Sequence, residues 1–328
     1  MRVIKKIIKN AMPYGVVKRH FEKAVEISTS DYPKLFNEFG EEMLFMYLQN
    51  YRSAHLPYSQ MSGRMPRRIL WDKCNNALKL QMYSHLTMFS RVPLKEGMKQ
   101  FGIMQEAEII CPNEYDIVYK RKQEVESLDA LFTFSERLLD KYSNAKFSLC
   151  NGVWYGTKLY GGIMDPERCY KKSKLISAVA SSKAMCPIHV FRAETARELK
   201  RKKIADCMGT AVGEYFDKIS DAFDDYMYNV AIENESQRYY FTEKILDCFA
   251  SMTVPIYYGA SDIGKFFNED GIIRIKEPSF KSVMEAISLC SEDDYRSRLE
   301  AIKDNYERVQ GYLSVDDYLT NNYMDLFL

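Results

Sequence analysis

The chain has 328 residues and a formal net charge of +1, from 46 Lys and Arg against 45 Asp and Glu. This balance excludes whole-chain charge as an attraction for nucleic acid or membranes, and we expect no nucleic acid partner. The 46% hydrophobic and 28% charged residues exclude disordered, collagen-like and disulfide-scaffold classes. At about 150 residues per domain, the length predicts two domains.

The cysteines are dispersed. The sequence has eight of them, no Cys-x-x-Cys pair and only four His, which argues against a zinc site and for a reducing compartment. The N-terminus lacks the apolar core and cleavage site of a secretory signal peptide. The longest charge-free run, Cys248 to Ser261, is too short to span a bilayer. We therefore expect a soluble, cytoplasmic protein.

The first segment is strongly basic, because residues 1–23 hold seven Lys or Arg and one Glu. Apolar residues recur at helical spacing among the lysines from Val3 to Ile8, which predicts a basic amphipathic helix that Pro13 interrupts. Such a helix lies on an anionic membrane surface, at about 1 kcal/mol per Lys or Arg, or packs one apolar stripe against the protein. The first alternative would make the protein peripheral on the inner face of the cell membrane.

Residues 31–50 also have helical spacing and predict a second helix, with these apolar residues on one side: Leu35, Phe36, Phe39, Met43, Leu44 and Tyr47. From about residue 66, short apolar runs alternate with helical stretches. Strands are predicted at Arg68–Trp71, Phe101–Met104, Ala130–Phe134 and Lys146–Leu149, with a helix at Ser135–Tyr142.

A second series begins near residue 172. Strands are predicted at Lys174–Ala180, Ile204–Met208, Tyr228–Ile232, Val254–Tyr258 and Ile272–Ile275, with helices at Phe191–Lys202 and Thr242–Ser251. Strands that alternate with helices imply right-handed crossovers and a parallel sheet. The predicted fold is therefore α/β, with two Rossmann-like domains facing a cleft.

Four regions follow from these patterns. Residues 1–55 are predicted to form a helical N-terminal extension, and residues 301–328 a helical C-terminal tail. Between them, residues 56–170 form the first Rossmann-like domain and residues 171–300 the second. The Gly-flanked aromatic loop from Asn151 to Gly156, near the junction, suits either hinge packing or stacking of an acceptor.

The most informative stretch runs from Tyr228 to Ala260 and reads as strand, polar loop, helix and strand. Thr242 suits a helix N-cap, and Glu243 suits the first turn. Lys244 does not, because a cation at a helix N-terminus opposes the macrodipole. A docked polyanion such as a diphosphate would explain it, because the helix start and the lysine both attract phosphate. The alternative is that Lys244 pairs in solvent with Glu243 or Glu235.

This stretch closely resembles the signature of the α1,3/4-fucosyltransferases (glycosyltransferase family 10), which reads approximately FENS, a short spacer, YVTEK, a helix and TVPVYxG. The positions that match are Glu233, Asn234, Tyr240, Thr242, Glu243, Lys244, Val254, Pro255, Tyr257 and Gly259. Glu235 replaces the Ser of FENS, and Phe241 replaces the Val before TEK. The resemblance covers about residues 172–276 and is much weaker over the N-terminal half.

The resemblance implies a GT-B fold whose second domain holds a nucleotide-sugar donor, usually GDP-fucose. It implies that Lys244 and an upstream arginine neutralise the diphosphate. Arg192 matches that arginine best, with Arg197 and Arg201 as neighbouring alternatives. Asn234 and Tyr240 would line the phosphates and the sugar, and Glu243 would accept hydroxyls from the ribose or fucose. His189 would either donate to a phosphate or cap a helix.

The resemblance also implies a general base, a Glu at the end of a strand of the N-terminal domain, shortly before a Pro. Glu106 follows the predicted strand Phe101–Met104 and is our choice. Glu108 is the alternative, because the spacing to Pro112 departs from the usual family pattern. A carboxylate just beyond a strand end also sits where open α/β sheets bind ligands.

No Asp-x-Asp triplet occurs in the sequence, and fixed cations with a helix N-terminus can stabilise a departing diphosphate. We therefore expect a site without metal or other cofactor. The predicted function is inverting transfer of L-fucose from GDP-β-L-fucose to a hydroxyl of a surface glycan or polysaccharide. One alternative is a different GDP- or UDP-sugar donor, and another is a non-catalytic nucleotide- or carbohydrate-binding scaffold.

Overall fold

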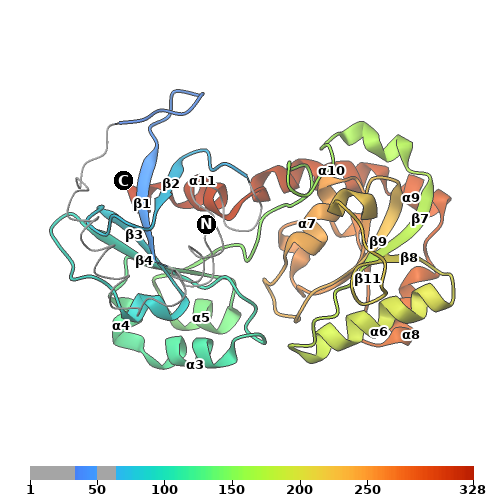
Figure 1. Cartoon of the computed structure of the whole chain (residues 1–328), viewed down its shortest axis with the longest axis horizontal. Coiled ribbons are helices and arrows are strands. Elements are labelled where there is room, and N and C mark those ends of the chain that lie inside the picture. Colours follow the sequence, from blue (N-terminus) through green and yellow to red (C-terminus); the bar gives the residue numbers. More distant parts are fainter. Residues whose placement is uncertain (1–33, 50–63) are drawn as a thin grey trace, which may run out of the picture.

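The computed structural model describes residues 34–49 and 64–328 (Figure 1). The basic segment 1–23, predicted as an amphipathic helix, lies outside the described residues. Two α/β domains lie side by side in Figure 1, each built on one parallel sheet. Within the described part of the chain, every helix is too short or too polar to cross a bilayer.

The first domain contains a six-stranded parallel sheet in the order β2-β1-β3-β4-β5-β6. Its strands are β1 (Leu44–Gln49), β2 (Ile69–Asp72), β3 (Leu80–Ser84), β4 (Lys99–Ile103), β5 (Ala130–Thr133) and β6 (Ala145–Phe147). The helices α3 (Pro112–Lys120), α4 (Lys122–Glu126) and α5 (Glu136–Lys141) lie together below this sheet in Figure 1. A parallel sheet buries both faces, so the opposite face also needs a cover.

The C-terminal helix α11 (Val315–Phe327) provides that cover. Phe327 packs on Phe101 of β4 and Phe132 of β5, with ring centroids 5.1 and 6.1 Å apart. The indole Nε1 of Trp71, on β2, donates to Asp316 at 3.1 Å. The last helix of the chain therefore completes the core of the first domain.

The second domain contains a five-stranded parallel sheet in the order β11-β10-β9-β7-β8. Its strands are β7 (Lys174–Val179), β8 (Asp206–Met208), β9 (Tyr226–Ile232), β10 (Val254–Tyr258) and β11 (Ile273–Arg274). Its helices are α6 (Pro187–Arg201), α7 (Glu243–Ala250), α8 (Phe280–Ile287), α9 (Glu292–Ser297) and α10 (Leu299–Val309). In Figure 1, α6 and α8 lie on one side of the sheet, and α7 and α10 lie on the other. Every residue of the central strand β9 is buried.

The chain passes between the domains twice. It crosses to the second domain between β6 and β7, and it returns between α10 and α11. The two crossings touch, because the backbone N–H of Val153 donates to the carbonyl of Leu313 at 3.1 Å. Gly152 allows this approach, since a Cβ there would lie 2.3 Å from the Leu313 carbonyl oxygen. Two Rossmann-like domains and a returning C-terminal helix confirm the predicted α/β, GT-B fold class.

The prediction of a helix over residues 31–50 is wrong for the described part, residues 34–49. Residues 44–49 form β1, which pairs with β2 and β3 inside the first sheet. Met46 and Leu48 alternate into the core, whereas Phe36 and Phe39 of the proposed apolar side are 60% and 63% exposed. Residues 44–49 thus belong to the first domain and not to a helical extension.

The other predicted elements appear close to their expected bounds, and the tail is helical as predicted. Four elements were not anticipated: β3, α3, α4 and α8. In β3, Gln81 is fully buried, and its side-chain amide donates to the carbonyls of Asn76 and Leu78. A buried polar residue of this kind interrupts the apolar run, so a prediction based on apolar runs misses the strand.

Candidate functional site

A cavity of about 330 Å³ lies between the two domains. Glu106 and Ile110 line it from the first domain, and the ends of β7 and β9 and the start of α7 form most of the wall from the second domain. All eight residues predicted for the site line this cavity: Glu106, His189, Arg192, Asn234, Tyr240, Thr242, Glu243 and Lys244. They come from both halves of the chain. The structure therefore brings Glu106 together with residues that lie between about 80 and 140 positions further along the chain.

The start of α7 is fixed to the end of β9 by one buried carboxylate. Glu233 is 0% exposed, and it accepts the backbone N–H of Thr242 at 2.8 Å and the Thr242 hydroxyl at 2.7 Å. Thr242 is the N-cap, as predicted, and its hydroxyl oxygen accepts the backbone N–H of Lys244. The helix N-terminus, with its partial positive charge, is thereby held at the cavity wall.

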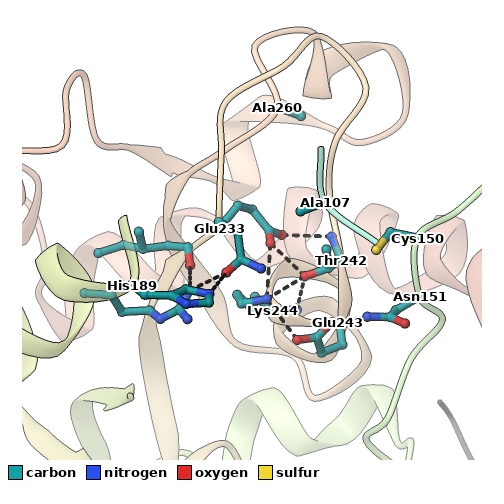
Figure 2. Close-up of polar contacts among 12 residues, drawn as sticks. Ala107, Cys150, Asn151, His189, Glu233, Thr242, Glu243, Lys244 and Ala260 are labelled. Atoms are coloured by element: carbon teal, nitrogen blue, oxygen red, sulfur yellow. Dashed lines mark hydrogen bonds and ion pairs between the residues drawn. The ribbon is translucent and has the colours of Figure 1, made fainter. Parts of the chain in front are cut away.

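Lys244 lies within a cluster of acceptors (Figure 2). Its Nζ is 2.9 Å from Glu243 Oε1, 3.4 Å from Glu233 Oε2 and 3.0 Å from the Thr242 hydroxyl. Burial opposes the charged form of Lys244, but the Glu243 and Glu233 carboxylates outweigh it and raise the lysine pKa. The alternative of a solvent-exposed pair with Glu243 or Glu235 is thus corrected: Glu243 is a partner, but the pair is part of the cavity wall and the second partner is Glu233.

The two acids of this cluster differ in their environment. Burial raises the pKa of Glu233 despite the nearby Lys244. Burial also acts on Glu243, but Lys244 and the Asn151 amide, which donates to Glu243 at 2.9 Å, lower its pKa on balance. Asn151 belongs to the segment that connects the domains, so Glu243 links α7 to this segment.

A second polar group contains His189, which lies beside this cluster in Figure 2, and Arg192, which also belongs to α6. Arg192 Nη1 donates to the Ile232 carbonyl at 2.8 Å and to Asn234 Oδ1 at 3.1 Å. His189 Nδ1 accepts the backbone N–H of Met185, so its Nε2 carries the proton and donates to Asn234 Oδ1 at 3.0 Å. Burial and the neighbouring Arg192 lower the pKa of His189.

The alternative arginines do not reach the cavity. Arg197 donates to the carbonyl of Ala211 at 3.0 Å. Arg201 pairs with Glu198 on the surface of α6. The geometry therefore favours Arg192 as the arginine that can meet an anion in the cavity.

Access to the cavity also distinguishes the two candidate general bases, Glu106 and Glu108. Glu106 lines the cavity, whereas Glu108 is absent from its walls. Glu108 forms an ion pair with Arg137 of α5 and accepts the Ser135 hydroxyl at 2.9 Å. Between the two, Glu106 alone has its side chain where a cavity ligand could meet it.

Asp247 of α7 also lines the cavity and was missed from the sequence. It is 2% exposed, and its Oδ1 accepts the backbone N–H groups of Trp154 and Tyr155 at 2.7 and 2.9 Å. Burial raises its pKa to about 8, with the nearby Glu243 adding to the effect. A charged residue within the apolar run Ile245–Ala250 was the available signal.

Within the described residues, His85, Cys111 and Glu114 form the one group whose donor atoms are close enough to hold a metal ion. His85 Nδ1 lies 2.7 Å from Glu114 Oε2, while Nε2 accepts the backbone N–H groups of Gln105 and Glu106 at 3.3 and 3.4 Å. Because Nε2 accepts, the ring proton sits on Nδ1 and faces Glu114. A metal-bound histidine instead donates from its other nitrogen. These contacts fit a brace for the segment that carries Glu106 better than a metal centre.

The fold and the cavity define a two-domain α/β protein of the GT-B class with cationic groups in its interdomain cleft. Residues 169–298 match the family model "Glycosyltransferase family 10 (fucosyltransferase) C-term", which confirms the resemblance noted for the second domain. An α-(1,3)-fucosyltransferase of Helicobacter pylori is 36% identical over 81 residues. That match covers 25% of this chain and 15% of the relative.

Solved structures with a similar fold include an α1,3-fucosyltransferase with GDP. The superposition has a TM-score of 0.48 and 15% sequence identity, and it covers 88% of this chain and 96% of that one. The same kind of enzyme with GDP-fucose gives a TM-score of 0.47 and 16% identity, over 89% and 95% of the two chains. A sucrose-phosphate synthase from Thermosynechococcus elongatus gives a TM-score of 0.47 and 10% identity, over 76% and 74%.

Proposed function

We propose that the protein is an inverting glycosyltransferase that moves L-fucose from GDP-β-L-fucose to a hydroxyl of a carbohydrate acceptor. One observation carries this proposal. Residues matched to the family signature and a carboxylate from the opposite domain line the same cavity of about 330 Å³. A transferase needs this combination, because the donor phosphates and the attacking hydroxyl must meet at one carbon atom.

The donor diphosphate would lie against the start of α7 and the Arg192–His189 pair. Arg192 uses its Nη1 nitrogen to donate to Ile232 and Asn234, so its Nε and Nη2 nitrogens remain to donate to a phosphate. Lys244 is held in place by its two carboxylate partners, and the α7 N-terminus adds a fixed positive potential. Such preorganised charges stabilise a departing nucleotide diphosphate, so we propose that the reaction requires no metal ion.

The reaction itself would be a single displacement. The acceptor hydroxyl oxygen forms a bond to the anomeric carbon as the bond from that carbon to the β-phosphate oxygen breaks. The electron pair of the broken bond leaves with GDP, and the hydroxyl proton passes to Glu106. Attack opposite the leaving group converts the β-linked donor into an α-linked product.

The departures from the family signature do not point to another donor. Phe241 is 1% exposed and packs on Phe266 with ring centroids 4.9 Å apart, inside an aromatic cluster. Glu235 faces the backbone of Glu108 and Ile109. Neither side chain lines the cavity. A changed donor therefore finds no support in these two substitutions.

The first test compares Glu106→Gln with Glu108→Gln in a GDP-fucose transfer assay. Loss of a general base lowers kcat by about 10²- to 10⁴-fold, so we expect that loss in Glu106→Gln, with GDP affinity unchanged by calorimetry. Glu108→Gln should retain most of the activity of the folded protein. Near-normal turnover in Glu106→Gln would reject the assigned base.

The second test concerns the donor. A ligand that binds only the folded state raises the free energy of unfolding, by about 2.7 kcal/mol when its concentration is a hundred times Kd, and the melting temperature rises accordingly. GDP should stabilise the wild-type protein, and Arg192→Gln should reduce that effect. Stabilisation by UDP but not by GDP would reject fucose as the transferred sugar. Tight GDP binding without turnover for any donor would instead indicate a binding scaffold.

A further inference from the structure

The segment that carries Glu106, residues 105–109, follows β4 and has little regular structure of its own. The first domain braces its beginning. His85 accepts the backbone N–H groups of Gln105 and Glu106, and the Tyr115 hydroxyl donates to the Glu106 carbonyl at 2.7 Å. His85 itself has a φ of 51°, a strained value that persists in a non-glycine residue only when its surroundings fix it.

The end of the segment is held from the other domain. Glu235, in the loop after β9, accepts the backbone N–H of Glu108 at 2.9 Å through Oε1 and that of Ile109 at 3.0 Å through Oε2. Each carboxylate oxygen thus takes one of two consecutive N–H groups. Burial raises the pKa of Glu235, and the N–H groups of Ile109 and Glu108 act against that rise because they stabilise the ionised form. When the carboxyl is ionised, hydrogen bonds to it are about twice as strong as neutral ones. The Ser of the family signature has one hydroxyl oxygen on a shorter side chain and could not make this paired contact.

Glu235 is firmly attached to the second domain. The neighbouring Ser236 hydroxyl donates to the Gly259 carbonyl at 2.8 Å, and the Ser261 N–H donates to the Gln237 carbonyl at 3.2 Å. Both contacts tie the loop to the chain after β10. If the domains separated at this point, the second domain would therefore carry Glu235 away from residues 108 and 109.

A second contact crosses the junction at the same loop but does not touch the segment. Arg238 donates to Glu136 of α5 from its backbone N–H at 3.0 Å and from its Nε at 3.1 Å. This ion pair joins the domains without contacting residues 105–109. Arg238 also pairs with Asp140 of α5, so a change at Glu136 weakens this interdomain contact and leaves residues 105–109 untouched, which makes it the control.

We propose that Glu235 is a positioning residue that couples closure of the two domains to placement of Glu106. This inference rests on the proposed function, because it assigns to Glu106 the role of base. In the closed arrangement the segment is fixed at both ends, by the His85 brace and by Glu235. In an open arrangement its second end is released, and Glu106 loses its fixed approach to the cavity.

The experiment compares Glu235→Gln with Glu136→Gln at saturating donor and acceptor. A glutamine at position 235 can accept one N–H, but its amide NH₂ faces the other, so the paired contact is lost. Misplacement of a reacting group by about 1 Å can cost about 10²-fold in rate, so we expect kcat to fall by about 10- to 100-fold. GDP affinity should stay within about twofold, because Glu235 does not line the cavity. Glu136→Gln should keep its kcat.

A double-mutant cycle separates positioning from general stability. Because Glu235 acts through Glu106, adding Glu235→Gln to Glu106→Gln should cause little further loss of kcat. Hydrogen exchange gives a readout independent of activity. With GDP bound, the amides of residues 108 and 109 should exchange faster in Glu235→Gln and at the wild-type rate in Glu136→Gln.

Several results would overturn the inference: an unchanged kcat in Glu235→Gln, an equal loss in Glu136→Gln, or additive losses in the double variant. Failure of the proposed function is recognised separately, as a wild-type protein that transfers no fucose. In that event, an unchanged rate of amide hydrogen exchange at residues 108 and 109 in Glu235→Gln would also overturn this inference. A faster rate would support the conclusion that Glu235 fixes the end of the segment.

Discussion

Asp247 should make the stability of this protein depend on pH in an unusual direction. The side chain is 2% exposed on α7 and holds the segment between the domains through the N–H groups of Trp154 and Tyr155. Burial is the main cause of its raised pKa, about 8 against an ordinary value of 3.8. We consider the substitution Asp247→Asn, whose amide oxygen can accept the same two N–H groups but does not titrate.

The sign follows from proton binding. Between about pH 4 and pH 8 the folded protein keeps a proton on Asp247 that the unfolded chain has released. The free energy of unfolding therefore falls as pH rises through this window, by up to about 1.4 kcal/mol per pH unit. From pH 5 to pH 7 the wild-type protein should lose about 3 kcal/mol from this group alone. Below about pH 4 the contribution is fully present.

The assay is denaturant unfolding at pH 5, 6 and 7, followed by the fluorescence of the two tryptophans, Trp71 and Trp154. The stability of Asp247→Asn relative to wild type should rise by about 3 kcal/mol across this range. Asp217→Asn, at an exposed position, changes the net charge equally and serves as control. Parallel pH curves for Asp247→Asn and wild type would refute the assignment of a protonated, buried carboxyl.

Two further predictions concern the cluster on α7 and the crossing between the domains. Lys244→Met leaves the buried carboxylates Glu233 and Glu243 without their shared cation and should destabilise the protein by about 3–5 kcal/mol, whereas adding Glu233→Gln should restore part of the stability but not GDP binding. Urea unfolding and calorimetry measure both effects, and a fully stable Lys244→Met would contradict the pairing. Gly152→Ala puts a Cβ 2.3 Å from the Leu313 carbonyl oxygen and should cost about 1–3 kcal/mol in the same unfolding assay. Gly311→Ala meets nothing within 4 Å and should be near neutral, so equal losses in the two variants would argue against the crowding.

The second sheet could be predicted well because its strands are buried on both faces. β9 and β10 therefore read as short apolar runs, and the predicted Val254–Tyr258 matches the observed strand. β1 could not be predicted in this way. Its apolar residues satisfy a helical period as well as a strand, and only pairing with β2 and β3, from more distant parts of the chain, decides between them.

The same distinction applies to the site. The residues from Glu233 to Lys244 lie within one strand–helix unit, so a local signature could locate them. The choice between Glu106 and Glu108 depends on Arg137, which takes Glu108 into an ion pair from α5. The contact of Glu235 with residues 108 and 109 depends on how two domains meet. Spacing along the sequence carries no information about either contact.

The return of α11 to the first sheet has a consequence for biosynthesis. A growing chain emerges from the ribosome N-terminus first, and domains generally fold in that order. Here the first sheet cannot cover Phe101 and Phe132 until Phe327 has been added and released from the exit tunnel. The first half therefore keeps part of its apolar surface uncovered, and open to chaperones, while the second half is being synthesised.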